Sequence, residues 1–301
     1  MNGSLTNKKS KIGALKRVKW IAWLLILPSL VLLYFLVWRP VLSGIFLSFF
    51  ELKNYEPVKF VGMENYRRVV SDTLFLKTLS NTVKYVLWSL LFGYLTPVVL
   101  AVMLNELVHF KGIFKFSIYF PSIVPGAAVS LIWYFMYYPT EAGLLNALRS
   151  LVGMQPFVWL QNSAFTIPLI ILSLTWQGCG GTMIMYLAAL QGINQELYEA
   201  TKIDGANAWQ RIKTVTVPQI WPMMALYLVK QIIGIFQIMQ EPLLMTGGGP
   251  NNASVSLALS AYRYAFVYFK PQNALAVGTI TFMILIMLTF LYVGMNKKME
   301  S

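Results

Sequence analysis

Residues 196–222, ELYEATKIDGANAWQRIKTVTVPQIWP, decide how the rest of this chain is interpreted. The stretch is polar, and an apolar run long enough to cross a bilayer lies on each side of it. Its first part has the pattern of a short amphipathic helix, which Gly205 can end because glycine adopts a left-handed backbone without steric cost. Residues 206–214 predict a second helical piece, after which Pro218 and Pro222 mark the return to the membrane. A solvated loop with its charges facing water is the alternative interpretation.

The composition is that of a membrane protein. Hydrophobic residues make up 57% of the 301 residues and charged residues 12%, whereas a soluble domain carries roughly 25% charged residues. The formal net charge of +13 does not indicate a nucleic-acid partner, because the basic residues gather at the edges of apolar runs. We therefore expect an all-α integral membrane protein surrounded by lipid, with no nucleic acid among its partners.

Six apolar runs are long enough to span a bilayer. The predicted spans are residues 20–38, 83–105, 116–138, 164–190, 223–240 and 274–293. Residues 41–50 are apolar but too short to cross again, so we expect them to lie along the membrane. Residues 242–262 carry no charge, but the glycines at 247–249 argue against a spanning helix there, because lipid cannot satisfy an open backbone.

The distribution of charge predicts the orientation of the chain. Residues 1–19 hold six basic residues and no acidic one directly before the first span, which places the N-terminus in the cytoplasm. Six spans return the C-terminus to the same side. We therefore predict a cytoplasmic N-terminal segment at 1–19, a membrane domain at 20–296 and a cytoplasmic tail at 297–301, with the polar loop 191–222 also in the cytoplasm.

The spacing within the polar loop resembles a known motif. The string EAT at 199–201 is followed by three residues, Gly205, nine residues and VTVP at 215–218. This pattern resembles the EAA loop of ABC importer permeases, in which Glu-Ala-Ala, three residues, Gly and nine residues precede Ile-x-Leu-Pro. Thr201 stands in place of the second alanine, and two valines replace the isoleucine and the leucine. In that family the loop forms a coupling helix that docks on a cytoplasmic ATPase.

Two further strings resemble the sugar-uptake type of ABC permease. They are FVGMENY at 60–66, similar to F-V-G-x-E-N-Y, and TGGGP at 246–250, similar to T-x-G-G-P. With the polar loop they occur in the order found in that family. The resemblance implies a type I ABC importer permease fold, multi-pass in the cytoplasmic (inner) membrane. The residues that it assigns to the ATPase-coupling loop are Glu199, Ala200, Thr201, Asp204, Gly205 and Pro218.

The resemblance also implies partner subunits. These are a second permease in a heterodimer, two cytoplasmic ATPase subunits and an extracytoplasmic solute-binding protein. The sequence contains no G-x-x-x-x-G-K-[ST] string, so ATP is expected on the partner ATPases and no cofactor is expected in this chain. A single cysteine, Cys179, and a single histidine, His109, do not supply a zinc site or a Cys/His nucleophile pair. No catalytic or metal-binding residue is therefore predicted.

Polar and aromatic residues in the fourth and fifth spans are the candidates for the substrate path. They are Trp176, Gln177, Phe236, Gln237 and Gln240. Neutral amides beside aromatic faces suit sugars, which present hydroxyl groups and C–H surfaces. Gln237 and Gln240, three residues apart, are expected to share one face of the fifth span. The alternative is that these amides bond between helices and stabilise packing.

Two other features of these spans have competing interpretations. Gly178, Gly180 and Gly181 predict close approach of a neighbouring helix or of a solute. Lys230 is the one charge in the predicted fifth span. We expect it to extend toward the cytoplasmic edge of the membrane, with a role in transport as the alternative.

The sequence therefore predicts a permease subunit that moves a mono- or oligosaccharide in an ATP-driven, binding-protein-dependent importer. An ABC permease for another solute, such as glycerol phosphate, is an alternative. A membrane-embedded enzyme is a second alternative, which would require clustered polar catalytic groups within the spans. The sequence shows no such cluster.

Overall fold

The computed structural model describes residues 20–300, which are mainly helical. Five helices in this range are long and apolar enough to span a membrane: Trp20–Leu47, Thr73–Glu106, Ser163–Gln191, Ala208–Phe236 and Pro271–Gly294. A bent pair, Lys111–Ile123 and Gly126–Met136, supplies a sixth span. This is the all-α membrane fold that the sequence predicts. The predicted N-terminal segment 1–19 and Ser301 lie outside the described residues.

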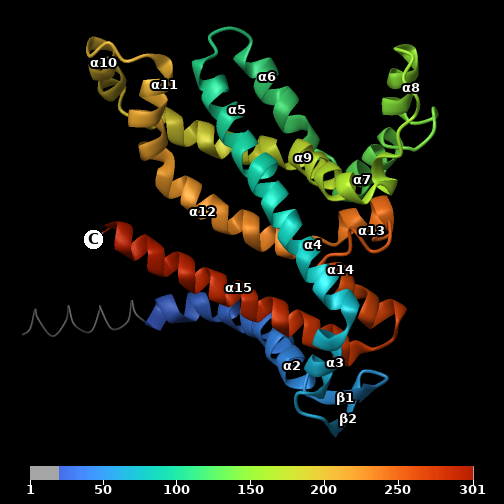
Figure 1. The fold of residues 1–301 in the computed structure, drawn as a ribbon. Helices are drawn as coiled ribbons and strands as arrows, with labels where there is room; N and C mark the ends of the chain where they lie inside the picture. The colour runs from blue at the N-terminus through green and yellow to red at the C-terminus, as the bar shows by residue number, and fades with distance from the viewer. Residues whose placement is uncertain (1–19, 301) are drawn as a thin grey trace, which may run out of the picture.

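The first helix is longer than its predicted span. Trp20–Leu47 runs through a π-helical turn at Tyr34–Trp38 into α2 (Arg39–Leu47) without a break. Residues 41–47 therefore continue the first helix, whereas we expected a separate segment along the membrane. Figure 1 shows this helix beside α15 (Pro271–Glu300), and α2 packs on α15. None of the side chains in its most apolar stretch is buried, so lipid or another chain must cover them.

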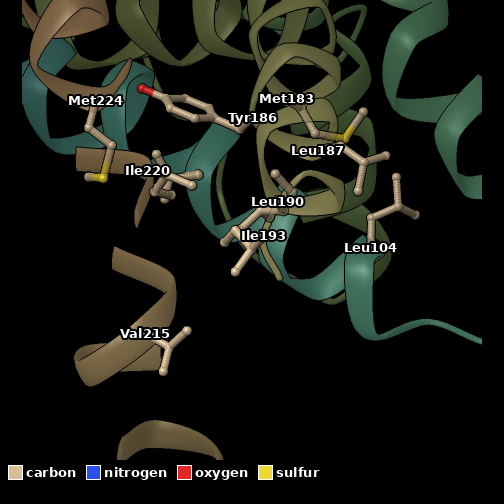
Figure 2. Packing of buried hydrophobic residues seen from close by; sticks show 11 residues of the cluster. Leu104, Met183, Tyr186, Leu187, Leu190, Ile193, Val215, Ile220 and Met224 are labelled. Atoms are coloured by element: carbon tan, nitrogen blue, oxygen red, sulfur yellow. The ribbon is translucent and has the colours of Figure 1, made fainter. Parts of the chain in front are cut away.

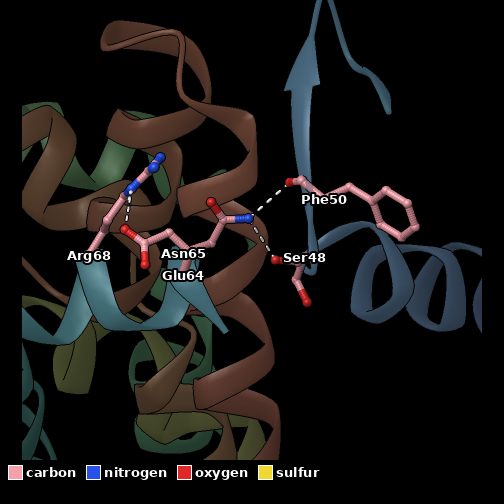
Figure 3. Close-up of polar contacts among 5 residues, drawn as sticks. All are labelled: Ser48, Phe50, Glu64, Asn65 and Arg68. Atoms are coloured by element: carbon pink, nitrogen blue, oxygen red, sulfur yellow. Dashed lines mark hydrogen bonds and ion pairs between the residues drawn. The ribbon is translucent and has the colours of Figure 1, made fainter. Parts of the chain in front are cut away.

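A small outer unit follows the first helix. Strands β1 (Phe50–Lys53) and β2 (Glu56–Phe60) pair antiparallel, with Phe50 opposite Phe60. The buried Asn65 of α3 (Glu64–Ser71) donates hydrogen bonds to the carbonyl oxygens of Ser48 at 2.8 Å and Phe50 at 2.9 Å (Figure 3). The string at 60–66 therefore fastens the hairpin to the end of the first helix.

The second span also begins earlier than predicted. Helices α4 (Thr73–Ser89) and α5 (Leu95–Glu106) form one span, joined by a π-helical turn at Leu90–Tyr94. Asp72 sets its start, because its carboxylate accepts the Leu74 backbone N–H at 2.9 Å. The predicted span 83–105 therefore covers only the later part of this helix.

The third span is broken, where the sequence predicted one run at 116–138. Helix α6 (Lys111–Tyr119) and the short 3-10 turn Phe120–Ile123 meet α7 (Gly126–Met136) at 100°. The cause is Pro125, which disfavours a helical backbone at the residue before it, and Val124 is extended with ψ 132°.

The second half of the chain holds the polar loop and three further spans. Its elements before α15 are α8 (Leu144–Leu151), α9 (Ser163–Gln191), α10 (Gln195–Ile203), α11 (Ala208–Arg211), α12 (Val217–Phe236), α13 (Gln240–Thr246) and α14 (Leu257–Tyr262). The predicted interruption at 247–249 is present between α13 and α14. Gly247 and Gly248 adopt φ values of +57° and +88° there.

Helix α4 holds this glycine-rich connection in place. The Asn81 side chain donates to the carbonyl oxygens of Asn252 at 2.8 Å and Val255 at 3.1 Å. The buried Tyr85 hydroxyl donates to Ser254 O at 3.0 Å. These side chains satisfy backbone groups that an irregular segment would otherwise leave unpaired.

The elements are arranged with two distinct ends. In Figure 1, α10, α11 and the C-terminal end of α15 lie at the left, whereas the hairpin, α8 and α13 lie at the right. A buried apolar cluster near the left end joins α5, α9 and α12. It includes Leu104, Met183, Leu187, Leu190 and Ile220, with Ile193 and Val215 beside the polar loop (Figure 2). The polar loop is therefore packed onto the spans that flank it.

Candidate coupling loop and solute cavity

The polar loop folds as a helix, a left-handed glycine and a second helix. Asn194 caps α10 by accepting the Glu196 backbone N–H at 3.1 Å, and Gly205 ends the turn after it with φ +75°. Asn207 then starts α11 with a capping box that involves Gln210. These caps explain why such a short polar stretch is ordered outside the spans.

The predicted coupling residues lie mainly on the surface of this loop. Thr201, Asp204 and Gly205 line one small hollow at the end of α10. Glu199 and Ala200 are exposed on α10, but Pro218 lies apart from them, in α12. The loop therefore groups five of the six predicted residues at the end of α10 and leaves the sixth at the start of the following span.

Two exposed apolar side chains on this loop were not among the predicted residues. Ile203 is 86% exposed and Trp209 is 72% exposed. Large apolar side chains exposed at a polar loop are typical of a surface that another protein covers. The sequence could have indicated this surface, because both residues are large apolar side chains within a polar stretch.

The loop is attached to the next span through a side-chain contact. The Tyr198 hydroxyl on α10 lies 3.1 Å from the Thr216 hydroxyl, which is buried. Thr201 does not contribute to this contact, since its hydroxyl donates to Tyr198 O within α10 at 2.9 Å. This contact joins α10 to the helix that carries Thr216.

The span after the loop is one continuous helix, Ala208–Phe236. We expected a separate helical piece and a break at Pro218 and Pro222, and this expectation was wrong. A π-helical turn at Ile212–Thr216 precedes Pro218, and the Val217 N–H bonds to Ile212 O, five residues back. The wider turn accommodates the proline, so the helix continues from the polar loop into the membrane domain.

A cavity of about 450 Å³ lies at the other end of this helix, among α4, α9, α12 and α13. Its neutral polar lining consists of Ser89, Thr175, Thr182, Gln231, Gln237 and Gln240. A second cavity of about 490 Å³ lies against it on α9 and α12. The two share Gly178, Thr182, Tyr227 and Lys230, so they form one hollow between α9 and α12.

The structure places three of the five predicted path residues in this hollow. Gln237 and Gln240 line the first cavity and Gln177 lines the second. Phe236 does not, because it is buried in an apolar cluster with residues of α3, α4 and α14. Trp176 lines neither cavity and packs edge-on against Trp133, with ring centroids 5.8 Å apart.

Gln237 and Gln240 reach the cavity by a different route from the predicted one. Helix α12 ends at Phe236, and Gln240 is the first residue of α13, so the two amides do not share a helix face. The carbonyl of Ile238, between the helices, accepts a hydrogen bond from the buried Ser256 hydroxyl. This bond holds the non-helical connection that directs both amides to the hollow.

The bend in the third span brings two of the amides together. The Gln177 side-chain amide donates to Val124 O at 3.1 Å, and the Ser122 hydroxyl donates to Gln177 O at 2.7 Å. A Cβ added to Gly126 would lie 2.8 Å from Gln240 Nε2 and 3.6 Å from Gln177 Nε2. The absence of a side chain at Gly126 therefore allows both amides to meet at the start of α7.

The three glycines of the fourth span have different surroundings. A Cβ at Gly180 would lie 2.4 Å from Ile118 O, so α6 approaches α9 closely at that point. A Cβ at Gly178 or Gly181 would meet nothing within 4 Å, and both glycines line the hollow. The predicted close helix contact therefore occurs at Gly180, and open space occurs at the other two.

Two charged residues also line the hollow. The exposed Lys230 side chain lies in both cavities, with Nζ 5.2 Å from the centre of the Tyr227 ring. We expected this lysine to extend to the cytoplasmic edge, but the structure places it in the wall of the hollow. Glu241 of α13 lines the first cavity. The sequence indicated a possible functional role for Lys230, because it is a charged residue in a spanning segment. It did not indicate that Glu241 lines the cavity, because that depends on the path of α13.

Comparison with known proteins is consistent with this geometry. Residues 93–299 match the family described as "Binding-protein-dependent transport system inner membrane component". The chain is 31% identical to the probable ABC transporter permease protein YurN of Bacillus subtilis, over 93% of this chain and 97% of the relative. It is 31% identical to the lactose transport system permease protein LacF of Rhizobium radiobacter, over 89% and 90%.

A solved structure shares the fold. It is that of a bacterial ABC transporter involved in the import of the acidic polysaccharide alginate. The match has a TM-score of 0.85 and covers 97% of this chain and 100% of the other, at 23% sequence identity. At this identity the likeness concerns the arrangement of helices.

Proposed function

This chain belongs to the family of binding-protein-dependent transport system inner membrane components, and on that premise we propose that the hollow between α9 and α12 is the path of a saccharide. The chain is a multi-pass permease subunit of an ABC importer in the inner membrane. Relatives are named as permeases for lactose, arabinooligosaccharides and trehalose or maltose. The neutral amides and hydroxyls of the hollow support a sugar as the solute, because they match its hydroxyl groups.

The observation that carries the proposal is the continuous helix Ala208–Phe236. Its 29 residues extend about 43 Å at about 1.5 Å per residue. One end carries the exposed Trp209, and the other carries the cavity residues Lys230, Gln231 and Gly234. The helix is continuous from the polar loop to the cavity, so a displacement of the loop alters the wall of the hollow.

The mechanism follows from this connection. One of two cytoplasmic ATPase subunits binds the surface around Ile203 and Trp209, and ATP-driven closure of the ATPases moves α10 and the helix after it. A second permease completes the central path, and an extracytoplasmic binding protein delivers the solute. The N-terminus, the polar loop and the C-terminal tail lie on the cytoplasmic side. No nucleotide site is required in this chain.

Cysteine labelling of the complete importer tests the orientation and the docking surface. In a Cys179→Ala background with measured uptake, Ile203→Cys should react with a membrane-impermeant maleimide only in inside-out vesicles from which the ATPase has been removed. In the complete importer it should be shielded and should cross-link to the ATPase. Val58→Cys is the matched control, since Val58 is 66% exposed on β2 at the other end of the molecule. It should react in intact cells. Labelling of Ile203→Cys from outside intact cells would overturn the proposal.

A further inference from the structure

Lys230 is a cation without an ionic partner in the wall of the proposed path. It lines both cavities, and its Nζ lies over the Tyr227 ring. Among the side chains that the structure describes, which exclude those of residues 291 and 295–300, the one ion pair within 4 Å joins Arg68 to Glu64, outside the hollow. No carboxylate among the described side chains therefore pairs with this lysine of a spanning helix.

The physical cost of such a charge depends on whether the hollow is open. In an open, hydrated hollow, water solvates the ammonium group. When the hollow closes around a solute, most of that water leaves, and an unpaired charge in a low-dielectric environment becomes strongly unfavourable. The ring of Tyr227 compensates for only part of this loss. With a neutral solute, no described side chain of this subunit would be paired with the charge at that step.

Glu241 does not remove this requirement. It lies on α13, whereas Lys230 lies six residues before the end of α12, about 9 Å along the helix axis at about 1.5 Å per residue. No ion pair joins the two side chains in the described part of the chain. A carboxylate accepts hydrogen bonds from sugar hydroxyls, so Glu241 and the amides Gln237 and Gln240 suit the uncharged part of a solute.

We propose that the transported solute carries a negatively charged group and that Lys230 pairs with that group in the closed hollow. The inference rests on the proposed function, because it assumes that the hollow is the path. The solute class is a saccharide that bears a carboxylate, sulfate or phosphate. The ammonium group lies at the Tyr227 side of the hollow and the neutral hydrogen-bonding groups lie toward α13. Lys230 therefore determines specificity for charge.

Uptake by cells that express the complete importer tests the proposal with matched probes. The first pair of probes is a galacturonic acid disaccharide and the neutral galactose disaccharide of the same linkage. Sulfated and phosphorylated derivatives of the galactose disaccharide test the other anionic groups. Glycerol 3-phosphate tests an anionic solute that is not a saccharide. The wild type should take up at least one anionic saccharide at least about tenfold faster than its neutral parent. Lys230→Gln should raise KM for that saccharide about tenfold or more, because it removes one partner of a desolvated charge pair.

Two variants separate charge pairing from a structural role. Lys230→Arg retains the charge and should retain more uptake than Lys230→Gln. Lys84→Gln removes a lysine from α4 that lines neither cavity, and it should leave KM unchanged. A structural role for Lys230 would instead lower the amount of inserted protein or reduce uptake of charged and neutral probes equally.

The possible outcomes are distinct. Equal uptake of neutral and anionic saccharides by the wild type, or an unchanged KM in Lys230→Gln, would overturn the inference while the importer function stands. Uptake of glycerol 3-phosphate in place of every saccharide, with loss in Lys230→Gln, would support the charge pairing and overturn the saccharide path. Absence of uptake for all probes would count against both.

Discussion

At the scale of single residues, the hollow depends on where small and polar side chains stand. Gln177 and Gln240 come from different helices, yet both amides lie beside Gly126 at the start of α7. Their positions depend on the space that glycine leaves there. A methyl group at Gly126 would contact the tip of a flexible side chain and not the backbone, so the site should change more than the fold.

Gly126→Ala should therefore impair transport without preventing folding. The added Cβ would lie 2.8 Å from Gln240 Nε2 and displace this amide from the hollow. We expect uptake of the transported solute to fall severalfold through KM, with normal membrane insertion. Initial uptake rates measure the effect. Gly112→Ala on α6 is the control, because a Cβ at Gly112 meets nothing within 4 Å. Unchanged KM in Gly126→Ala would contradict this assignment of Gln240.

At the scale of elements, helix ends and helix contacts build the site. The break at Val124 and Pro125 turns α7 across the end of α6, and the end of α12 at Phe236 allows α13 to line the first cavity. Helix α6 approaches α9 so closely at Gly180 that backbone meets backbone. This contact supports α9, which carries half of the hollow.

Gly180→Ala should destabilise the packing of α6 on α9. The added Cβ would lie 2.4 Å from Ile118 O and 2.6 Å from Tyr119 Cα, so one helix must move. We expect a loss of about 1–3 kcal/mol, the usual cost of overpacking. Thermal unfolding of the purified importer measures the loss. Gly181→Ala is the matched control for stability, since its Cβ meets nothing within 4 Å. Equal unfolding temperatures for the two variants would contradict the close contact.

At the scale of the whole molecule, the polar loop and the hollow lie toward opposite ends of one continuous helix. Two attachments transmit motion of α10 to that helix. One is the apolar cluster of α5, α9 and α12, and the other is the contact between the hydroxyls of Tyr198 and Thr216. Loss of the second contact should loosen the connection without altering either end.

Tyr198→Phe and Thr216→Val should each reduce the uptake produced per ATP hydrolysed, and their effects should not add. Both changes remove the same contact, so the double variant should resemble the stronger single one. Uptake and ATPase activity of the reconstituted importer measure the ratio. Thr289→Val on α15 is the control, because the exposed Thr289 hydroxyl bonds only to Leu285 O in the described structure. Additive losses would show that the two hydroxyls do not act together.

The sequence alone was sufficient for the features that depend on local chemistry. Residues 196–205 form a helix that ends at a left-handed glycine, because the caps and the glycine are close in sequence. The apolar runs form spanning helices, because their backbone groups must be satisfied internally in lipid. The interruption at 247–249 is present for the same reason. Arg263 donates to the carbonyl oxygen of Gly247 and the Ser254 hydroxyl donates to that of Gly249, while α4 binds the carbonyl oxygens of Asn252 and Ser254.

Tertiary structure alone decided which side chains share the hollow. Pro218 predicted a break, but the π-helical turn before it absorbs the proline and keeps the helix continuous. Phe236 and Gln237 are adjacent, yet one is buried against α14 and the other faces the cavity, because α12 ends between them. The sequence left two interpretations of Lys230 open, and the position of its side chain in the hollow favours the role in transport. A cavity depends on where several helices end and bend relative to one another, and those relations are contacts between residues distant in sequence.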